Sequence, residues 1–139
     1  MLGRDFLQPA KDLAPLTKEA HWRAAVGCAY YAVMLEARDA LERWGFGTFP
    51  PHQVHVQVRL RFTYPAHSDV KLVGQALDLL VQWHNRAHYR MSQVGPFSSN
   101  QVVVRAIKLA QDGIAVLDRL NADPAQRAAA VAAIRAAGF

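Results

Sequence analysis

The densest group of chemically capable side chains lies within the eight residues from Trp83 to Arg90. His84 and His88 are four positions apart, so they share one face of a helix, and Arg86 and Arg90 share a neighbouring face. Arginine neutralises phosphate oxygens through charge-assisted hydrogen bonds, and histidine transfers protons near neutral pH. These are the requirements for cleaving RNA by attack of its own 2′-hydroxyl without a metal. The candidate catalytic residues are His84, Arg86 and His88, and the candidate binding residues here are Asn85, Tyr89 and Arg90.

Two other interpretations apply to the histidine pair. A histidine on an apolar helix face, as at His84, is more often a core residue with its hydrogen bonds satisfied. His84 and His88 could also share a metal ion, but the chain has no HExxH motif and no obvious carboxylate as a third ligand, so we predict neither a metal nor a cofactor. Arg61 and His67 repeat an arginine–histidine spacing, with apolar Phe62 beside the arginine, and we attribute that match to chance.

The charge balance favours an anionic partner. Lysine and arginine outnumber aspartate and glutamate by 16 to 11, which gives a formal net charge of +5. A basic surface suits nucleic acid or another polyanion, although an arginine-rich chain can also reflect a GC-rich genome. The sequence has no phosphate-binding glycine loop and no GxSxG motif, so nothing in it supports a nucleotide hydrolase or a serine hydrolase.

The compartment is predicted from cysteine usage and hydropathy. Cys28 is the only cysteine, so no disulfide can form within the chain, and it reads as a buried, inert thiol. The N-terminal residues lack the apolar core of a signal peptide, and the longest weakly polar run, Ala24 to Leu35, is too short to cross a bilayer. We therefore expect a cytoplasmic protein without membrane contact.

The elements that must position these side chains are predicted to be helices. Residues 1–16 form a short segment interrupted by Pro9 and Pro15, and Thr17 caps a long helix that ends near Gly45. Residues 52–62 alternate between apolar and polar side chains, which favours a strand, but an isolated strand would have no partner, so we predict a second helix.

The remaining helices begin at polar caps and proline. Ser68 or Asp69 caps a third helix that carries the histidine pair near its end, and one of residues 98–100 caps a fourth. Asp123 and Pro124 open an alanine-rich C-terminal helix. The prediction is an all-α fold: an up-and-down four-helix bundle with an extra short C-terminal helix. The organisation is an N-terminal segment 1–16, a bundle 17–121 and a C-terminal helix 122–139.

The first long helix carries a more specific pattern than amphipathicity. Arg23 is followed by small residues over 24–29 and then by Tyr30, Tyr31 and Ala32. This order resembles the first long helix of HEPN domains, and the resemblance extends over about residues 17–120. At the third helix, one HEPN subgroup reads arginine, two variable residues, then Ala-Asp-Tyr. Here His84 takes the position of the arginine, Ala87 and Tyr89 match, and His88 replaces the aspartate.

The resemblance implies a HEPN-like bundle that forms a homodimer, with the third-helix ends meeting at a shared cleft. It also implies an RNA- or nucleotide-directed role in toxin–antitoxin, defence or nucleotidyltransferase-linked systems. HEPN ribonucleases carry an arginine and then, after four to six intervening residues, a histidine. Arg86 has no histidine at that distance. Tyr30 and Tyr31 join the candidate binding residues, although packing is the commoner role of such tyrosines.

Three functional hypotheses follow. The first is an RNA-directed protein, either a weak metal-independent endoribonuclease or a binder that has lost catalysis. The second is a non-catalytic protein–protein interaction module, for example the partner of a nucleotidyltransferase. The third is a structural bundle whose basic charge reflects genome composition.

Overall fold

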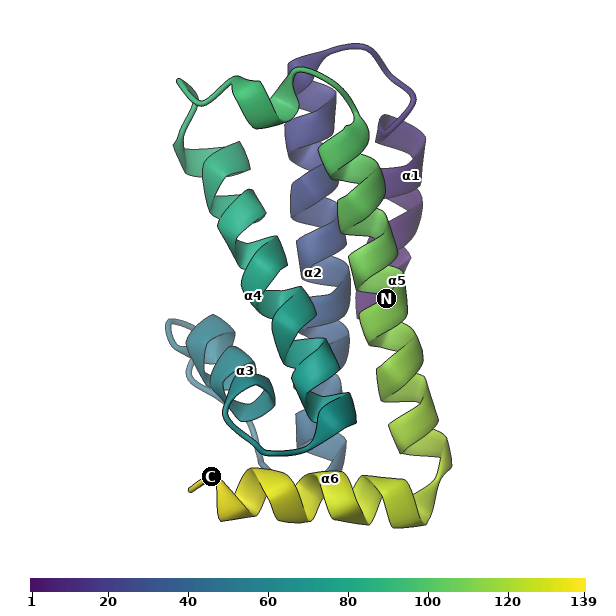
Figure 1. The fold of residues 1–139 in the computed structure, drawn as a ribbon, viewed down its shortest axis with the longest axis vertical. Helices are drawn as coiled ribbons and strands as arrows, with labels where there is room; N and C mark the ends of the chain where they lie inside the picture. The colour runs from purple at the N-terminus through teal and green to yellow at the C-terminus, as the bar shows by residue number, and fades with distance from the viewer.

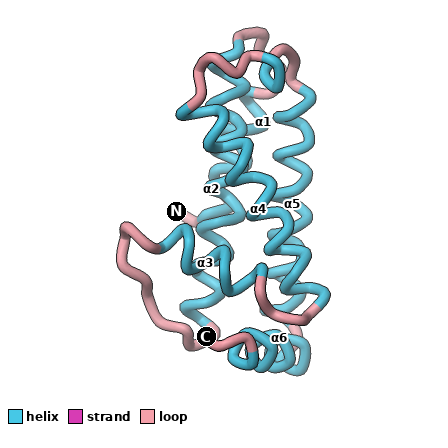
Figure 2. The backbone as a smooth tube through the Cα atoms, turned by 60° about the vertical axis from the view of Figure 1, so that its left-hand side comes forward, coloured by secondary structure: helices cyan, strands magenta, loops and turns pink.

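The computed structural model describes all 139 residues, and every regular element in it is helical (Figure 1). The elements in chain order are η1 (Gly3–Phe6), α1 (Leu7–Leu13), α2 (Glu19–Arg43), α3 (Val54–Thr63), α4 (Ser68–Tyr89), η2 (Gly95–Phe97), α5 (Gln101–Ala122) and α6 (Pro124–Ala136). The long helices α2, α4 and α5 run side by side, α3 lies beside the first half of α4, and α6 crosses their ends (Figure 1, Figure 2). The all-α prediction is confirmed, and the arrangement is compatible with a helical bundle.

Small side chains on α2 allow the other long helices to approach it closely. Ala25, Ala29 and Ala32 are fully buried there. On α5, Gly113 faces Val33 of α2, and a Cβ at Gly113 would lie 3.0 Å from a Val33 methyl carbon. Close packing of this kind strengthens dispersion contacts between the helices and leaves little room for larger residues. The longest helix is therefore the centre of the core.

The segment predicted as either strand or helix is the helix α3. Only Val58 and Phe62 are fully buried in it, and their spacing of four is that of a helix. The other apolar residues of the alternating run are exposed or half-buried. Gly74 of α4 lies against the carbonyl oxygen of Phe62, so that α3 and α4 approach each other through backbone. The helix prediction for residues 52–62 is confirmed.

Two predicted helix starts are wrong. The residue before α2 is Lys18, so Thr17 does not cap it. The cap of α4 is His67 rather than Ser68 or Asp69, because the His67 Nδ1 atom accepts a hydrogen bond from the Val70 backbone N–H at 3.4 Å. The His67 ring is thus engaged as a helix cap. This is consistent with our attribution of the arginine–histidine spacing of Arg61 and His67 to chance.

Two other predicted boundaries are confirmed. The long helix α2 ends at Arg43, and Gly45 follows with a φ of +90°, a left-handed conformation that favours glycine. At the start of α6, the Asp123 carboxylate accepts hydrogen bonds from the backbone N–H groups of Ala125 and Gln126. Pro124 occupies the first turn, where its missing N–H has no consequence.

The N-terminal segment is more ordered than its prolines predict. Pro9 lies inside α1, in the first turn, so the predicted interruption at Pro9 is wrong. The Arg4 guanidinium joins this segment to two helices through ion pairs of 2.7 Å with Glu36 and with Asp118. The Arg4 hydrogen bonds lower the pKa of the Glu36 carboxyl. No helix combines the length and apolar character that crossing a membrane requires.

Candidate functional site

Five aromatic and imidazole rings from three helices converge beside the second half of α4. We call this group the imidazole–tyrosine cluster; it comprises Tyr30 and Tyr31 of α2, His55 of α3, and His84 and His88 of α4. The His84 ring is its centre, stacked on Tyr30 with ring centroids 4.8 Å apart and edge-on to Tyr31 at 5.4 Å. The His84 and His88 ring centroids are 4.7 Å apart. The structure therefore brings together four of the predicted site residues.

The Tyr30 hydroxyl and His55 form the one short polar contact within the cluster, with 2.7 Å between Tyr30 Oη and His55 Nδ1. Burial raises the pKa of Tyr30 to about 12, so its hydroxyl keeps its proton and donates. Burial also lowers the pKa of His55. A neutral His55 accepts at Nδ1 and carries its own proton on Nε2. Sequence reasoning missed His55, although positions 55, 58 and 62 have the spacing of one buried helix face.

His84 is a buried imidazole with an unsatisfied ring nitrogen. The side chain is 8% exposed, and Nδ1 has no hydrogen-bond partner. Burial, followed by the neighbouring His88 and His55, lowers the pKa of His84 to about 4. The ring is therefore neutral at pH 7. The core-histidine interpretation is right about burial, but the expected hydrogen bonding is incomplete.

His88 and Tyr89 form the exposed edge of this region. The side chain of Tyr89 is 76% exposed, and its ring meets that of His84 at right angles with 6.2 Å between centroids. His88 lies over Gly27 of α2, where any Cβ would collide with the His88 Nε2 atom. A glycine at this position of α2 therefore provides the space in which the His88 ring sits.

The other predicted residues of α4 lie outside the cluster. Asn85, Arg86 and Arg90 are exposed, and neither arginine belongs to an ion pair. Two positions along an α-helix correspond to a rotation of about 200°, so Arg86 points away from the side that carries His84 and His88. Within a single copy of the chain, the arginines and the histidine pair do not converge on one point.

Arg23 holds the end of α4 in place, a role that sequence reasoning missed. Its guanidinium is buried and donates to the carbonyl oxygens of Arg86 at 2.9 Å and Ala87 at 3.0 Å. It also donates to the Gln93 carbonyl at 3.0 Å, beyond the helix end, and pairs with Glu19 at 2.6 Å. The last carbonyls of a helix have no partners within it, so a buried cation there satisfies them. Arg23 thereby positions residues 86–90.

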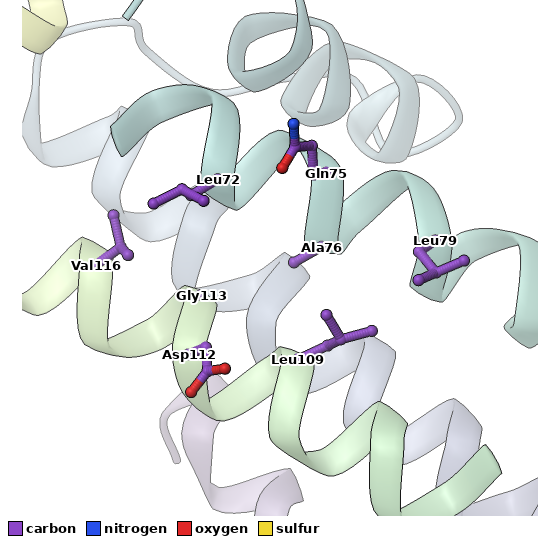
Figure 3. Close-up of a pocket in the computed structure, with 8 residues that line it drawn as sticks. All are labelled: Leu72, Gln75, Ala76, Leu79, Leu109, Asp112, Gly113 and Val116. Carbon is purple, nitrogen blue, oxygen red and sulfur yellow. The ribbon is translucent and has the colours of Figure 1, made fainter. Parts of the chain in front are cut away.

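An apolar hollow lies elsewhere, between α4 and α5 (Figure 3). Its volume is about 460 Å³, and apolar side chains dominate its lining. The lining residues are Leu72, Gln75, Ala76, Leu79, Leu109, Asp112, Gly113 and Val116. Its lining contains no histidine, cysteine, serine or lysine, so we take it as a surface for packing rather than for catalysis.

Comparisons with known proteins do not extend this description. No family model, curated protein or solved structure matches the chain. No three His, Cys, Asp or Glu side chains are grouped so that they could hold a metal ion. The HEPN resemblance therefore depends on the residues of α2 and α4 quoted above.

Proposed function

We propose that this chain is a HEPN-like protein that binds RNA or a nucleotide at the exposed edge of the imidazole–tyrosine cluster. The observation that carries the proposal is the convergence of five rings from α2, α3 and α4, with His88 and Tyr89 exposed at the margin. A role in toxin–antitoxin or defence systems is part of the same proposal and follows from the resemblance alone.

The chemistry of the margin suits a single-stranded nucleic acid. Unstacked bases bind by stacking on exposed aromatic side chains, and Tyr89 provides such a ring. Arg86 and Arg90 have no carboxylate partners, so both guanidiniums are available to backbone phosphates on the flank of α4. The net charge of +5 favours the approach of a polyanion.

Binding is better supported than catalysis. A general acid or base works best when its pKa is close to the working pH, and the pKa of His84, about 4, is far from neutrality. His88 is exposed, but Arg86 lies on another side of α4. A second copy of the chain, as the resemblance implies, would double these groups in one groove. We therefore propose metal-independent RNA cleavage only for such a homodimer.

The test is fluorescence anisotropy of a labelled single-stranded RNA in EDTA at physiological salt. Stacking on an aromatic side chain contributes roughly 1–3 kcal/mol per base, so the Tyr89→Ala and His88→Ala double variant should bind about tenfold more weakly or worse. His52→Ala is the matched control, since His52 is also exposed and lies outside the cluster. Equal affinity of the double variant and the wild-type protein would refute the proposal.

The hollow between α4 and α5 favours a second candidate, a protein–protein interaction module. Leu72 and Val104 are 50% and 54% exposed along the α4–α5 surface, and apolar grooves of this kind can accept an amphipathic helix. The partner suggested by the resemblance is a nucleotidyltransferase encoded beside this chain. Co-expression should then yield a complex that Leu72→Glu abolishes. In the RNA assay, the anisotropy of the labelled RNA should not change when the protein is added. Failure of that variant to alter the complex would contradict this candidate.

A further inference from the structure

The helix α5 begins without the side-chain cap that its sequence offers. Asn100 occupies the N-cap position, but its Nδ2 atom donates to the Ala14 carbonyl oxygen at 3.1 Å, and its side chain accepts no hydrogen bond from the helix. The backbone N–H groups of Val102 and Val103, in the first turn, have no acceptor in the protein. A helix of 22 residues therefore presents free donors and the positive end of its dipole.

A small polar pocket opens at this helix start, at the end of the bundle opposite α6 (Figure 1). Its volume is about 280 Å³, and none of the eight residues that line it is acidic. They come from α4, from η2 and the loop after it, and from the first turns of α5. Val102 is one of them, so the uncapped end of α5 borders the polar pocket. Such surroundings favour an anion over a cation.

Trp83, which lines the polar pocket from α4, is a second and independent sign of a ligand. It is 8% exposed, and a buried indole N–H usually has a hydrogen-bond partner. Trp22 Nε1 donates to the Leu16 carbonyl oxygen at 2.7 Å. Trp44 Nε1 donates to Asn121 Oδ1 at 2.9 Å. Trp83 Nε1 alone has no partner in the protein, and it is not one of the fully enclosed polar atoms, so it faces the polar pocket as a free donor.

Arg105, one turn into α5, adds a positive charge to the same pocket. Its Cζ atom lies 5.3 Å from the centroid of the Trp83 ring. A guanidinium has its N–H donors in its own plane, so a ring against its face leaves the donor edge available. Both residues line the polar pocket, and their contact therefore places a charged donor beside the free indole N–H. Hydrogen bonds from arginine to phosphate oxygens are among the strong ones.

We propose that the polar pocket binds a phosphate group, held by the start of α5, by Trp83 and by Arg105. A tetrahedral phosphate accepts hydrogen bonds from several directions, as donors on α4 and α5 require, whereas a carboxylate has two oxygens in one plane. The phosphate belongs either to a free anion or to the backbone of a nucleic acid, because both present the same oxygens. The polar pocket is separate from the imidazole–tyrosine cluster, and the inference does not depend on the proposed function.

The test follows the indole N–H signals of the three tryptophans by nuclear magnetic resonance of the full chain at constant ionic strength. Inorganic phosphate is the first probe, and a single-stranded RNA without a terminal phosphate is the second. We expect at least one probe to shift the Trp83 signal saturably, while the signals of Trp22 and Trp44, whose donors are occupied, stay in place. A response to phosphate alone identifies a free anion, and a response to the RNA identifies its backbone.

Two variants of α5 should weaken that binding. Arg105→Gln removes the charged donor, and Gln101→Glu places a carboxylate at the polar pocket, in the first turn, where it favours the helix but repels an anion. Each should weaken binding roughly tenfold or more, because a hydrogen bond to a charged group contributes about 1.5–3 kcal/mol. Lys108→Gln is the matched control, since it makes the same charge change as Arg105→Gln on the same helix, outside the polar pocket, and it should leave the affinity unchanged.

All three replaced side chains are exposed, so the core stays intact, and circular dichroism verifies the fold. The inference is wrong if neither probe shifts the Trp83 signal or if all three indole signals shift together. It is also wrong if Gln101→Glu binds as tightly as the wild-type protein, or if Lys108→Gln weakens binding as much as Arg105→Gln. RNA binding at Tyr89 and His88 is measured with other variants, so either proposal can fail alone.

Discussion

Acidification should destabilise this fold through His84. Burial and two neighbouring histidines lower the pKa of His84 from 6.5 to about 4 in the folded chain. Because the folded pKa lies below the unfolded value, the unfolded chain takes up the proton first as the pH falls. The contribution of His84 to stability is therefore fully present above about pH 6.5 and is lost between about pH 6.5 and pH 4.

The size of the loss follows from the pKa shift. One pKa unit corresponds to about 1.4 kcal/mol, so the shift sets an upper limit of about 3.4 kcal/mol. Partial protonation at pH 4.5 reduces the loss relative to pH 7 to about 2.4 kcal/mol. The neighbouring His88 is exposed, so water near the cluster screens the buried ring, and we expect about 2 kcal/mol.

The assay is urea unfolding at pH 7 and pH 4.5 of the wild-type protein and of His84→Leu. Leucine removes the titrating group without breaking a hydrogen bond, because Nδ1 of His84 has none to lose. Carboxylates such as Glu36 titrate in both proteins, so their effect cancels in the comparison. The wild-type protein should lose about 2 kcal/mol more than the variant. If the two losses agree within about 0.5 kcal/mol, the reasoning about His84 is refuted.

Two further predictions concern the helix contacts around the site. Replacing Arg23 by methionine should lower the free energy of unfolding, measured by urea titration, by about 3–5 kcal/mol, because the carbonyl oxygens at the end of α4 lose their buried donor. A loss below about 1 kcal/mol would contradict this role of Arg23. Gly27→Ala should leave stability unchanged or raise it by up to about 1 kcal/mol while it displaces the His88 ring and weakens RNA binding. In Gly74→Ala, the new methyl group would collide with the Phe62 backbone, so this variant should lower the free energy of unfolding by about 1–3 kcal/mol. Equal effects of the two glycine variants on stability would contradict these contacts.

Much of the fold follows from local rules that the sequence displays. Asp123 followed by Pro124 is a strong helix start, and α6 begins there. The α3 segment required a global argument, since its alternation favours a strand and only the lack of a partner strand favours a helix. The known preferences of amino acids for the N-cap position did not predict His67 as the cap of α4, because serine and aspartate, as at Ser68 and Asp69, are preferred there. Helix boundaries of this kind depend on a single hydrogen bond.

The candidate site was predictable only where its contacts are local. His84 and His88 share a face because they are four residues apart in one helix. The contact of Tyr30 with His55 joins residues 25 positions apart, and that of Arg23 with the Ala87 carbonyl joins residues 64 apart. No periodicity within one segment encodes such pairs, because they depend on how the helices pack.

The most direct test of RNA binding at the cluster uses the six histidines as reporters. Their imidazole signals would be followed by nuclear magnetic resonance while single-stranded RNA is added in EDTA. The account predicts that the signals of His84 and His88 shift saturably, whereas those of His52 and His67 stay in place. Saturating RNA that leaves His88 unmoved, or moves His52 and His67 equally, would contradict it.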